Sequence, residues 1–250
     1  MINLTLGRLK RPGLVVMLIG LLAITFAPAA LAVPVVGESD GQFSNVTGCV
    51  QGFNCLISDT QSNGDDTRLD WGLGLQGTSS LVAQDVDITA ETNAYDVLIG
   101  QLTWTNTPII SLFGPSSFDV TWTLSVAFSK PTGSADPQDD EAFNLHIVNT
   151  PNPASDVITG LTLTDLSGLS WSLNGVMVTN LEYDVQGGSL TTQSDGSVVW
   201  TNSESNTSTL QIKGDFTSPS AVPEPGTLIL LGTGLAGVAG RAWRKRRRAG

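Results

Sequence analysis

Few residues in this chain of 250 residues could carry out chemistry. The chain has one histidine, His146, and two cysteines, Cys49 and Cys55, which lie six positions apart. One histidine and two thiols do not supply the usual ligand set of a zinc site. His146 also lacks the Gly-x-Ser-x-Gly element that would accompany it in many hydrolases. We therefore expect His146 to be a polar residue on the exposed face of a strand. The cysteines could form a disulfide, a metal pair or a redox centre.

Carboxylates are the most abundant reactive groups. The densest cluster of acidic residues is Asp136, Asp139, Asp140 and Glu141. Carboxylates on loops are ligands that Ca²⁺ prefers, although this spacing does not fit an EF-hand loop. A glycan hydrolase would need two carboxylates facing each other across a cleft, which one sequence does not reveal. We interpret the cluster as a solvated loop, with a Ca²⁺ site as the alternative. We expect no enzymatic activity and no cofactor other than this Ca²⁺.

The last 28 residues combine three signals in a fixed order. The tripeptide Pro223-Glu224-Pro225 is extended and accessible, because two prolines bar a regular helix. An apolar stretch of about 18 residues, 226–243, follows and would span ~27 Å as a helix, near the lower limit for crossing a bilayer. Six cations mark its cytoplasmic end: Arg241, Arg244, Lys245, Arg246, Arg247 and Arg248. This order predicts a transmembrane helix with Glu224 at the outer face.

Residues 223–250 closely resemble the PEP-CTERM sorting signal of Gram-negative bacteria, in which the same three parts occur in the same order. The resemblance implies recognition by an exosortase, a membrane cysteine transpeptidase. It also implies that the tail anchors the chain in the inner membrane before transfer to the cell envelope or the extracellular space. A plain tail anchor that is never processed is the alternative.

The N-terminus carries an export signal. Three cations within residues 8–11 precede an apolar run over residues 14–26, and Ala30-Leu31-Ala32 supplies the small residues of a cleavage site. This pattern predicts a signal peptide over residues 1–32, with an uncleaved anchor as the alternative. The exported part then comprises a domain over residues 33–216 and a linker over residues 217–222.

The exported part is strongly acidic. Residues 33–222 contain three cations and 22 acidic residues, a formal net charge of −19. Such a surface repels nucleic acid and anionic lipid. Export also places Cys49 and Cys55 in an oxidising compartment, which favours a disulfide. The metal pair lacks further ligands, and a redox centre would favour a Cys-x-x-Cys spacing.

Residues 118–129 give the clearest strand pattern, because six apolar residues alternate with polar or small ones. Period-two alternation indicates a strand with one buried face. Weaker candidates are residues 68–75, 80–88, 97–104, 143–148, 157–163, 169–173, 176–185, 197–200 and 208–216. No part of the exported domain shows sustained helical periodicity. Many short strands predict an all-β fold, an antiparallel β-sandwich that is jelly-roll-like.

Two short motifs in the domain resemble the THxN type of PEP-CTERM protein, which is related to choice-of-anchor domains. They are Asp70-Trp71-Gly72 and residues 103–109, Thr-Trp-Thr-Asn-Thr-Pro-Ile. Trp104 occupies the position of the histidine, so we infer no metal or proton chemistry there. We expect a strand ending at Trp104 and an Asx-type turn at Asn106.

We predict a non-catalytic structural or surface protein of the cell envelope or of a biofilm matrix. The alternative is a carbohydrate-binding module for exopolysaccharide, assisted by Ca²⁺. A glycan hydrolase is less favoured. Five tryptophans lie in the exported part: Trp71, Trp104, Trp122, Trp171 and Trp200. Trp122 shares the apolar face of its strand and is a core residue. The other four could be core residues, which we favour for most of them, or part of a sugar-binding platform.

Overall fold

The computed structural model describes residues 32–59, 67–72, 77–108, 115–150 and 153–218, together with residues 232, 234, 235 and 237. The chain divides into two compact units, of which Ala32–Ser220 is one. The predicted signal peptide and sorting tail fall almost wholly outside the described residues. Among the described residues, no helix is long and apolar enough to cross a membrane.

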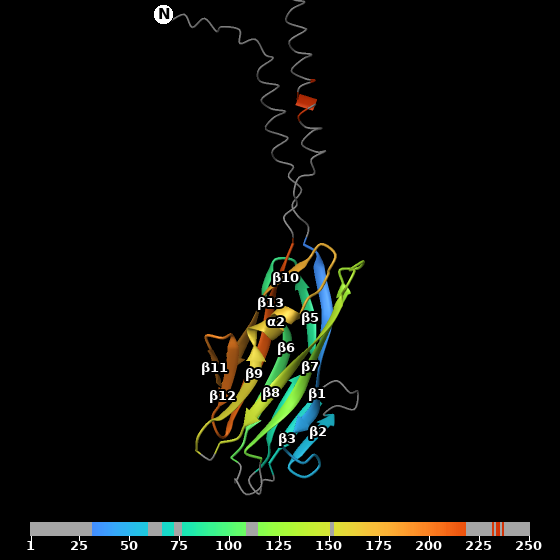
Figure 1. Cartoon of the computed structure of the whole chain (residues 1–250). Helices are drawn as coiled ribbons and strands as arrows, with labels where there is room; N and C mark the ends of the chain where they lie inside the picture. The colour runs from blue at the N-terminus through green and yellow to red at the C-terminus, as the bar shows by residue number, and fades with distance from the viewer. Residues whose placement is uncertain are drawn as a thin grey trace, which may run out of the picture. The chain divides into compact units, whose positions relative to one another are not determined.

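The unit Ala32–Ser220 is built from two antiparallel sheets (Figure 1). In sheet order, the seven-stranded sheet contains β11 (Ser189–Thr192), β12 (Ser197–Asn202), β9 (Asp156–Thr162), β8 (Gln138–Val148), β7 (Ser117–Lys130), β1 (Pro34–Thr47) and β5 (Val86–Glu91). The six-stranded sheet contains β10 (Met177–Gln186), β13 (Asn206–Thr217), β6 (Ala94–Asn106), β4 (Ser79–Gln84), β3 (Thr67–Trp71) and β2 (Cys55–Asp59). This architecture confirms the predicted all-β sandwich.

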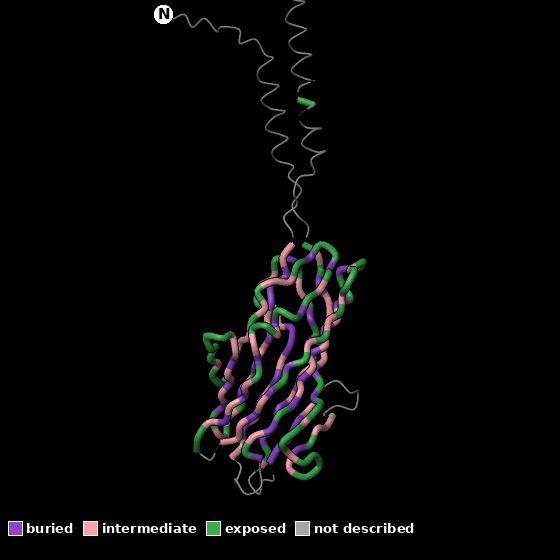
Figure 2. The backbone as a smooth tube through the Cα atoms, viewed as in Figure 1, coloured by how far each residue is buried: buried purple, intermediate pink, exposed green. Residues whose placement is uncertain are grey.

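Alternation along the strands fills the space between the sheets. Every second residue of β7 from Phe118 to Phe128 is buried, as the period-two pattern predicts, and Figure 2 shows the same alternation along most strands. Aromatic pairs join the sheets across the core. The rings of Trp104 on β6 and Trp200 on β12 lie 5.2 Å apart, and those of Trp71 on β3 and Phe118 on β7 lie 5.5 Å apart.

Four of the five tryptophans of the exported part are buried in the core, and the fifth packs against it. Four are at most 1% exposed, and the fifth, Trp171, is partly buried with its ring 5.5 Å from that of Phe128. The prediction that most of these residues are core is therefore confirmed. The four buried rings cannot form a sugar platform, because a ring must expose its face to stack on a sugar.

Several elements differ from the prediction. Strands β1, β2 and β11 were not predicted, and residues 80–88 form two strands, β4 and β5. Residues 169–173 are not a strand and follow a short helix, α2 (Leu163–Gly168). A capping box formed by Thr162 and Asp165 starts this helix. The pattern Thr-x-x-Asp is a known signal for the start of a helix. It was overlooked because residues 157–163 were predicted to form one continuous strand.

Asn106 does not form the predicted Asx-type turn. Strand β6 continues through Asn106, which is fully buried. Its Nδ2 donates to the carbonyl of Asn202 on β12 at 3.0 Å, and Asn202 Nδ2 donates to the carbonyl of Trp104 at 3.1 Å. The asparagines therefore cross-link the two sheets, and β6 extends two residues beyond Trp104.

The two chain ends of the sandwich meet at one turn. Thr92, which follows β5, donates through its backbone N to the carbonyl of Val33, and the backbone N of Asn93 donates to the carbonyl of Phe216. The connections between β1 and β2, β8 and β9, and β12 and β13 lie at the opposite end (Figure 1). We call this the remote end.

Candidate functional site

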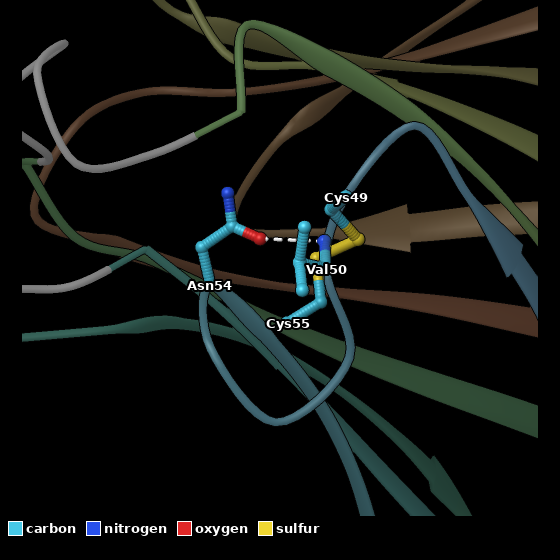
Figure 3. The surroundings of a disulfide bond; sticks show 4 residues. All are labelled: Cys49, Val50, Asn54 and Cys55. Atoms are coloured by element: carbon cyan, nitrogen blue, oxygen red, sulfur yellow. Dashed lines mark hydrogen bonds between the residues drawn. A yellow bond between two sulfur atoms is a disulfide. The ribbon is translucent and has the colours of Figure 1, made fainter.

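The disulfide loop, residues 49–55, is a rigid corner at the remote end. It carries the chain from β1 in one sheet to β2 at the edge of the other. Cys49 and Cys55 are joined by a disulfide, as predicted (Figure 3). Asn54 crosses the loop, and its Oδ1 accepts from the backbone N of Val50 at 2.7 Å. The backbone N of Gly72, beside β3, donates to the carbonyl of Asn54 at 3.0 Å and ties the loop to the sheet.

Apolar side chains project from this rigid corner into solvent. Phe53 is 64% exposed, Val50 61% and Leu56 49%. The sequence signal for this site is Phe53, a large apolar residue among the five residues between the two cysteines, and its exposure was not predicted. Because the disulfide and the backbone bonds hold the loop, these side chains are presented with little conformational freedom.

A shallow groove of about 280 Å³ lies beside Phe53. Asn54, Asp70 and Thr78 supply polar groups to its lining. Arg68 holds the carboxylate of Asp70 with contacts of 2.8 Å from both Nε and Nη2, so this acid is neutralised. The groove therefore combines one exposed aromatic ring with a carboxamide and a hydroxyl. These groups suit contact with an uncharged polar ligand.

The predicted acidic cluster is not a loop. Asp139, Asp140 and Glu141 lie on β8 and pair in register with β7, so successive carboxylates point to opposite faces. The backbone N of Ser170 donates to Asp139 Oδ2 at 2.6 Å. The pKa of Glu141 is raised, first by burial and then by Asp165 and Asp139.

The structure thus brings Asp139 and Glu141 together with Asp165 of α2, and it leaves Asp136 and Asp140 apart from them. Asp136 precedes the strand and forms a backbone bridge with Ser172. Nowhere in the described part of the chain do three or more His, Cys, Asp or Glu side chains form a group that could hold a metal ion.

A second acidic region lies on the seven-stranded sheet. A groove of about 540 Å³ is lined by four acidic residues of β1, β5 and the residue between β4 and β5: Glu38, Asp40, Asp85 and Asp87. His146 belongs to neither acidic region. It is partly exposed on β8 as expected, and its Nδ1 lies 2.7 Å from Asp119 Oδ1 on β7.

The predicted sorting residues lie outside the described residues, so the sequence comparison carries their assignment. Residues 221–247 match the PEP-CTERM protein-sorting motif. The matched range includes Pro223-Glu224-Pro225 and all of the basic residues except Arg248. No curated protein matches the chain. The motif identifies an exported, exosortase-sorted surface protein whose tail is anchored in the membrane before processing. The THxN resemblance stays a prediction.

Proposed function

We propose that the sandwich is a non-catalytic structural module, displayed in the cell envelope or the extracellular matrix of a Gram-negative bacterium. The sorting motif at residues 221–247 carries this proposal, because it immediately follows the end of the sandwich. Two further observations support it. The exported part has a formal net charge of −19, which keeps it solvated. The disulfide loop lies at the remote end of the sandwich, opposite the C-terminal end of β13 (Figure 1).

Processing at Pro223-Glu224-Pro225 tests the sorting step. One epitope is placed after Gly250 and a second is inserted at Ser194, which is exposed in the turn between β11 and β12. In cells that contain the exosortase, the two epitopes should separate, with the sandwich leaving the inner membrane. Glu224→Ala should leave export unchanged and keep both epitopes on one chain. Thr227→Ala, in the same tail, is the matched control and should be processed normally.

If both epitopes stay on one membrane-bound chain in wild-type cells, the chain is a plain tail anchor and the display proposal fails.

Carbohydrate binding is the second candidate function, and the disulfide loop favours it. Phe53 exposes its ring beside a groove lined by Asn54 and Thr78. Aromatic rings bind the apolar faces of sugars, and nearby amides and hydroxyls orient them. We propose exopolysaccharide as the ligand class. The glycan hydrolase is not proposed, because no observation favours it.

Co-sedimentation of the purified protein with exopolysaccharide, with and without EDTA, tests this candidate. Phe53→Ser should reduce binding at least tenfold. Tyr95→Ser is the matched control, since Tyr95 is 66% exposed at the start of β6, away from the groove. Equal binding by the two variants would remove the groove from the proposal, and no binding by the wild type would leave the structural function alone.

A further inference from the structure

Two acidic residues meet at the remote end, apart from the disulfide-loop groove. Asp156 begins β9 and is 0% exposed, while Glu204 lies in the turn between β12 and β13. Asp156 pairs in register with Asn202, two residues before Glu204. The adjoining hydroxyls of Ser155 and Ser203 lie 3.4 Å apart. The β8–β9 and β12–β13 turns are therefore direct neighbours, and each supplies an acidic side chain.

Three carboxylate oxygens of this pair are buried without a hydrogen-bond partner. Asp156 Oδ1 accepts from the backbone N of Thr150 at 2.7 Å and from its Oγ1 at 3.0 Å. Asp156 Oδ2 and both Oε atoms of Glu204 are buried, and no described donor reaches them. Burying an ionised carboxylate without a partner costs several kcal/mol, so this arrangement needs a compensating positive charge.

Among the described residues, no basic side chain is available to compensate these carboxylates. Burial, and then the negative charge of Asp156, raise the pKa of Glu204 to about 7. The exported part has only three basic residues. Arg68 and Lys213 form ion pairs with other acids. Lys130 ends β7 beside Val36, near the start of β1, at the opposite end of the sandwich.

We propose that Asp156 and Glu204 bind one Ca²⁺ ion, with their three unpartnered oxygens as ligands. The ligands are oxygen atoms only, which selects a hard cation over zinc or copper. One divalent ion neutralises two carboxylates. The hydroxyls of Ser155 and Ser203 lie beside the site and, with water, complete the coordination shell. Bound Ca²⁺ links the two turns at the remote end, at a position that the acidic run 136–141 does not share.

The test is Ca²⁺-dependent unfolding of the purified full-length chain in detergent. Protein stripped with EDTA is compared with protein titrated with CaCl₂, and NaCl at matched ionic strength controls for general screening. At Ca²⁺ about 100-fold above its Kd, the wild-type melting temperature should rise by about 5–10 °C. Glu204→Gln keeps the shape of the side chain and removes its charge. This variant should melt higher than wild type in EDTA and show no Ca²⁺-dependent shift.

Asp156→Asn provides a second variant that should lose the shift, because its amide removes one negative charge. Glu141→Gln is the matched control, since Glu141 is also partly buried among acids but lies beside α2, and it should keep the full shift. The proposal is overturned if CaCl₂ does not stabilise the wild type, if NaCl stabilises it equally, or if Glu204→Gln retains the shift. The proposal is also overturned if Glu204→Gln is more stable than wild type in EDTA while Ca²⁺ has no effect on wild type. That result would mean that a proton shared by the two carboxylates, and not Ca²⁺, relieves their repulsion.

Discussion

Asn106 Nδ2 donates to the carbonyl of Asn202 at 3.0 Å, and this hydrogen bond connects the two sheets within the buried core. The two residues are 96 positions apart in the sequence. Asn202 returns a bond to the carbonyl of Trp104, so two asparagines hold β6 and β12 at the end where the aromatic pair Trp104–Trp200 also packs. Polar cross-links of this kind tolerate substitution poorly, because they are buried.

Asn106→Ala should therefore destabilise the sandwich by about 1–3 kcal/mol, since it leaves a buried acceptor without its donor. Urea unfolding followed by tryptophan fluorescence measures the change. Asn144→Ala is the matched control, because Asn144 is exposed on β8, and it should stay within about 0.5 kcal/mol of wild type. Equal losses for the two variants would contradict a structural role for the asparagine cross-link.

The buried face of β7 gives a second prediction. Val120→Asp places a charge between the sheets, where Val120 is 2% exposed, and should cost about 3 kcal/mol or more. Asp119→Ser, one position away on the exposed face, removes only the surface contact with His146 and should cost less than about 1 kcal/mol. Thermal unfolding of both variants decides the matter, and similar melting temperatures would show that the face assignment is wrong.

The disulfide of the corner loop should contribute about 2 kcal/mol in the chain-entropy model, because it closes a short loop. The double variant Cys49→Ser, Cys55→Ser should lose this amount in chemical unfolding. Wild-type protein unfolded with a reductant should match the double variant, which serves as an internal control. If the double variant is as stable as the oxidised wild type, the prediction is wrong. The hydrogen bonds around Val50 and Asn54 would then be sufficient to stabilise this corner.

Glu141 makes folding stability depend on pH. Burial raises its pKa first, followed by the charges of Asp165 and Asp139. A carboxyl group with a raised folded-state pKa contributes stability that is full below its ordinary pKa and is lost as pH rises through the folded value. Glu141→Gln should therefore gain stability over wild type at pH 7.5 and lose this advantage at pH 4. Urea unfolding at both pH values checks this, and a constant difference would contradict it.

The sequence was sufficient for elements whose pattern is local. The period-two pattern over residues 118–129 predicted β7, because one face of that strand is buried along its whole length. The acidic run 136–141 was misjudged because prolines and a glycine surround it and suggest a loop. Pairing with β7 determines its structure instead, with Leu124 opposite Glu141 and Val126 opposite Asp139. Long-range pairing outweighs local composition there.

Strand β1 was missed because its glycines interrupt the apolar pattern. A Cβ at Gly41 would lie 2.7 Å from the Cβ of Ala83 and 2.8 Å from Trp122 Nε1, so close packing requires a glycine that β propensity disfavours. The candidate sites were harder still. Asp156 and Glu204 are 48 positions apart in the sequence and meet only because β9 pairs with β12. A motif defined by residue spacing within one segment could not have predicted that these two residues lie together.

The position of β13 has a mechanical consequence for a protein held at its C-terminal side. Strand β13 ends at Thr217, where the chain continues towards the sorting motif, and it lies between β10 and β6 rather than at a sheet edge. Drag on the sandwich would pull on this strand along its length and load its hydrogen bonds to both neighbours together. An edge strand would instead separate from a single neighbour. The chain therefore transmits tension through one of the most firmly supported strands of the domain.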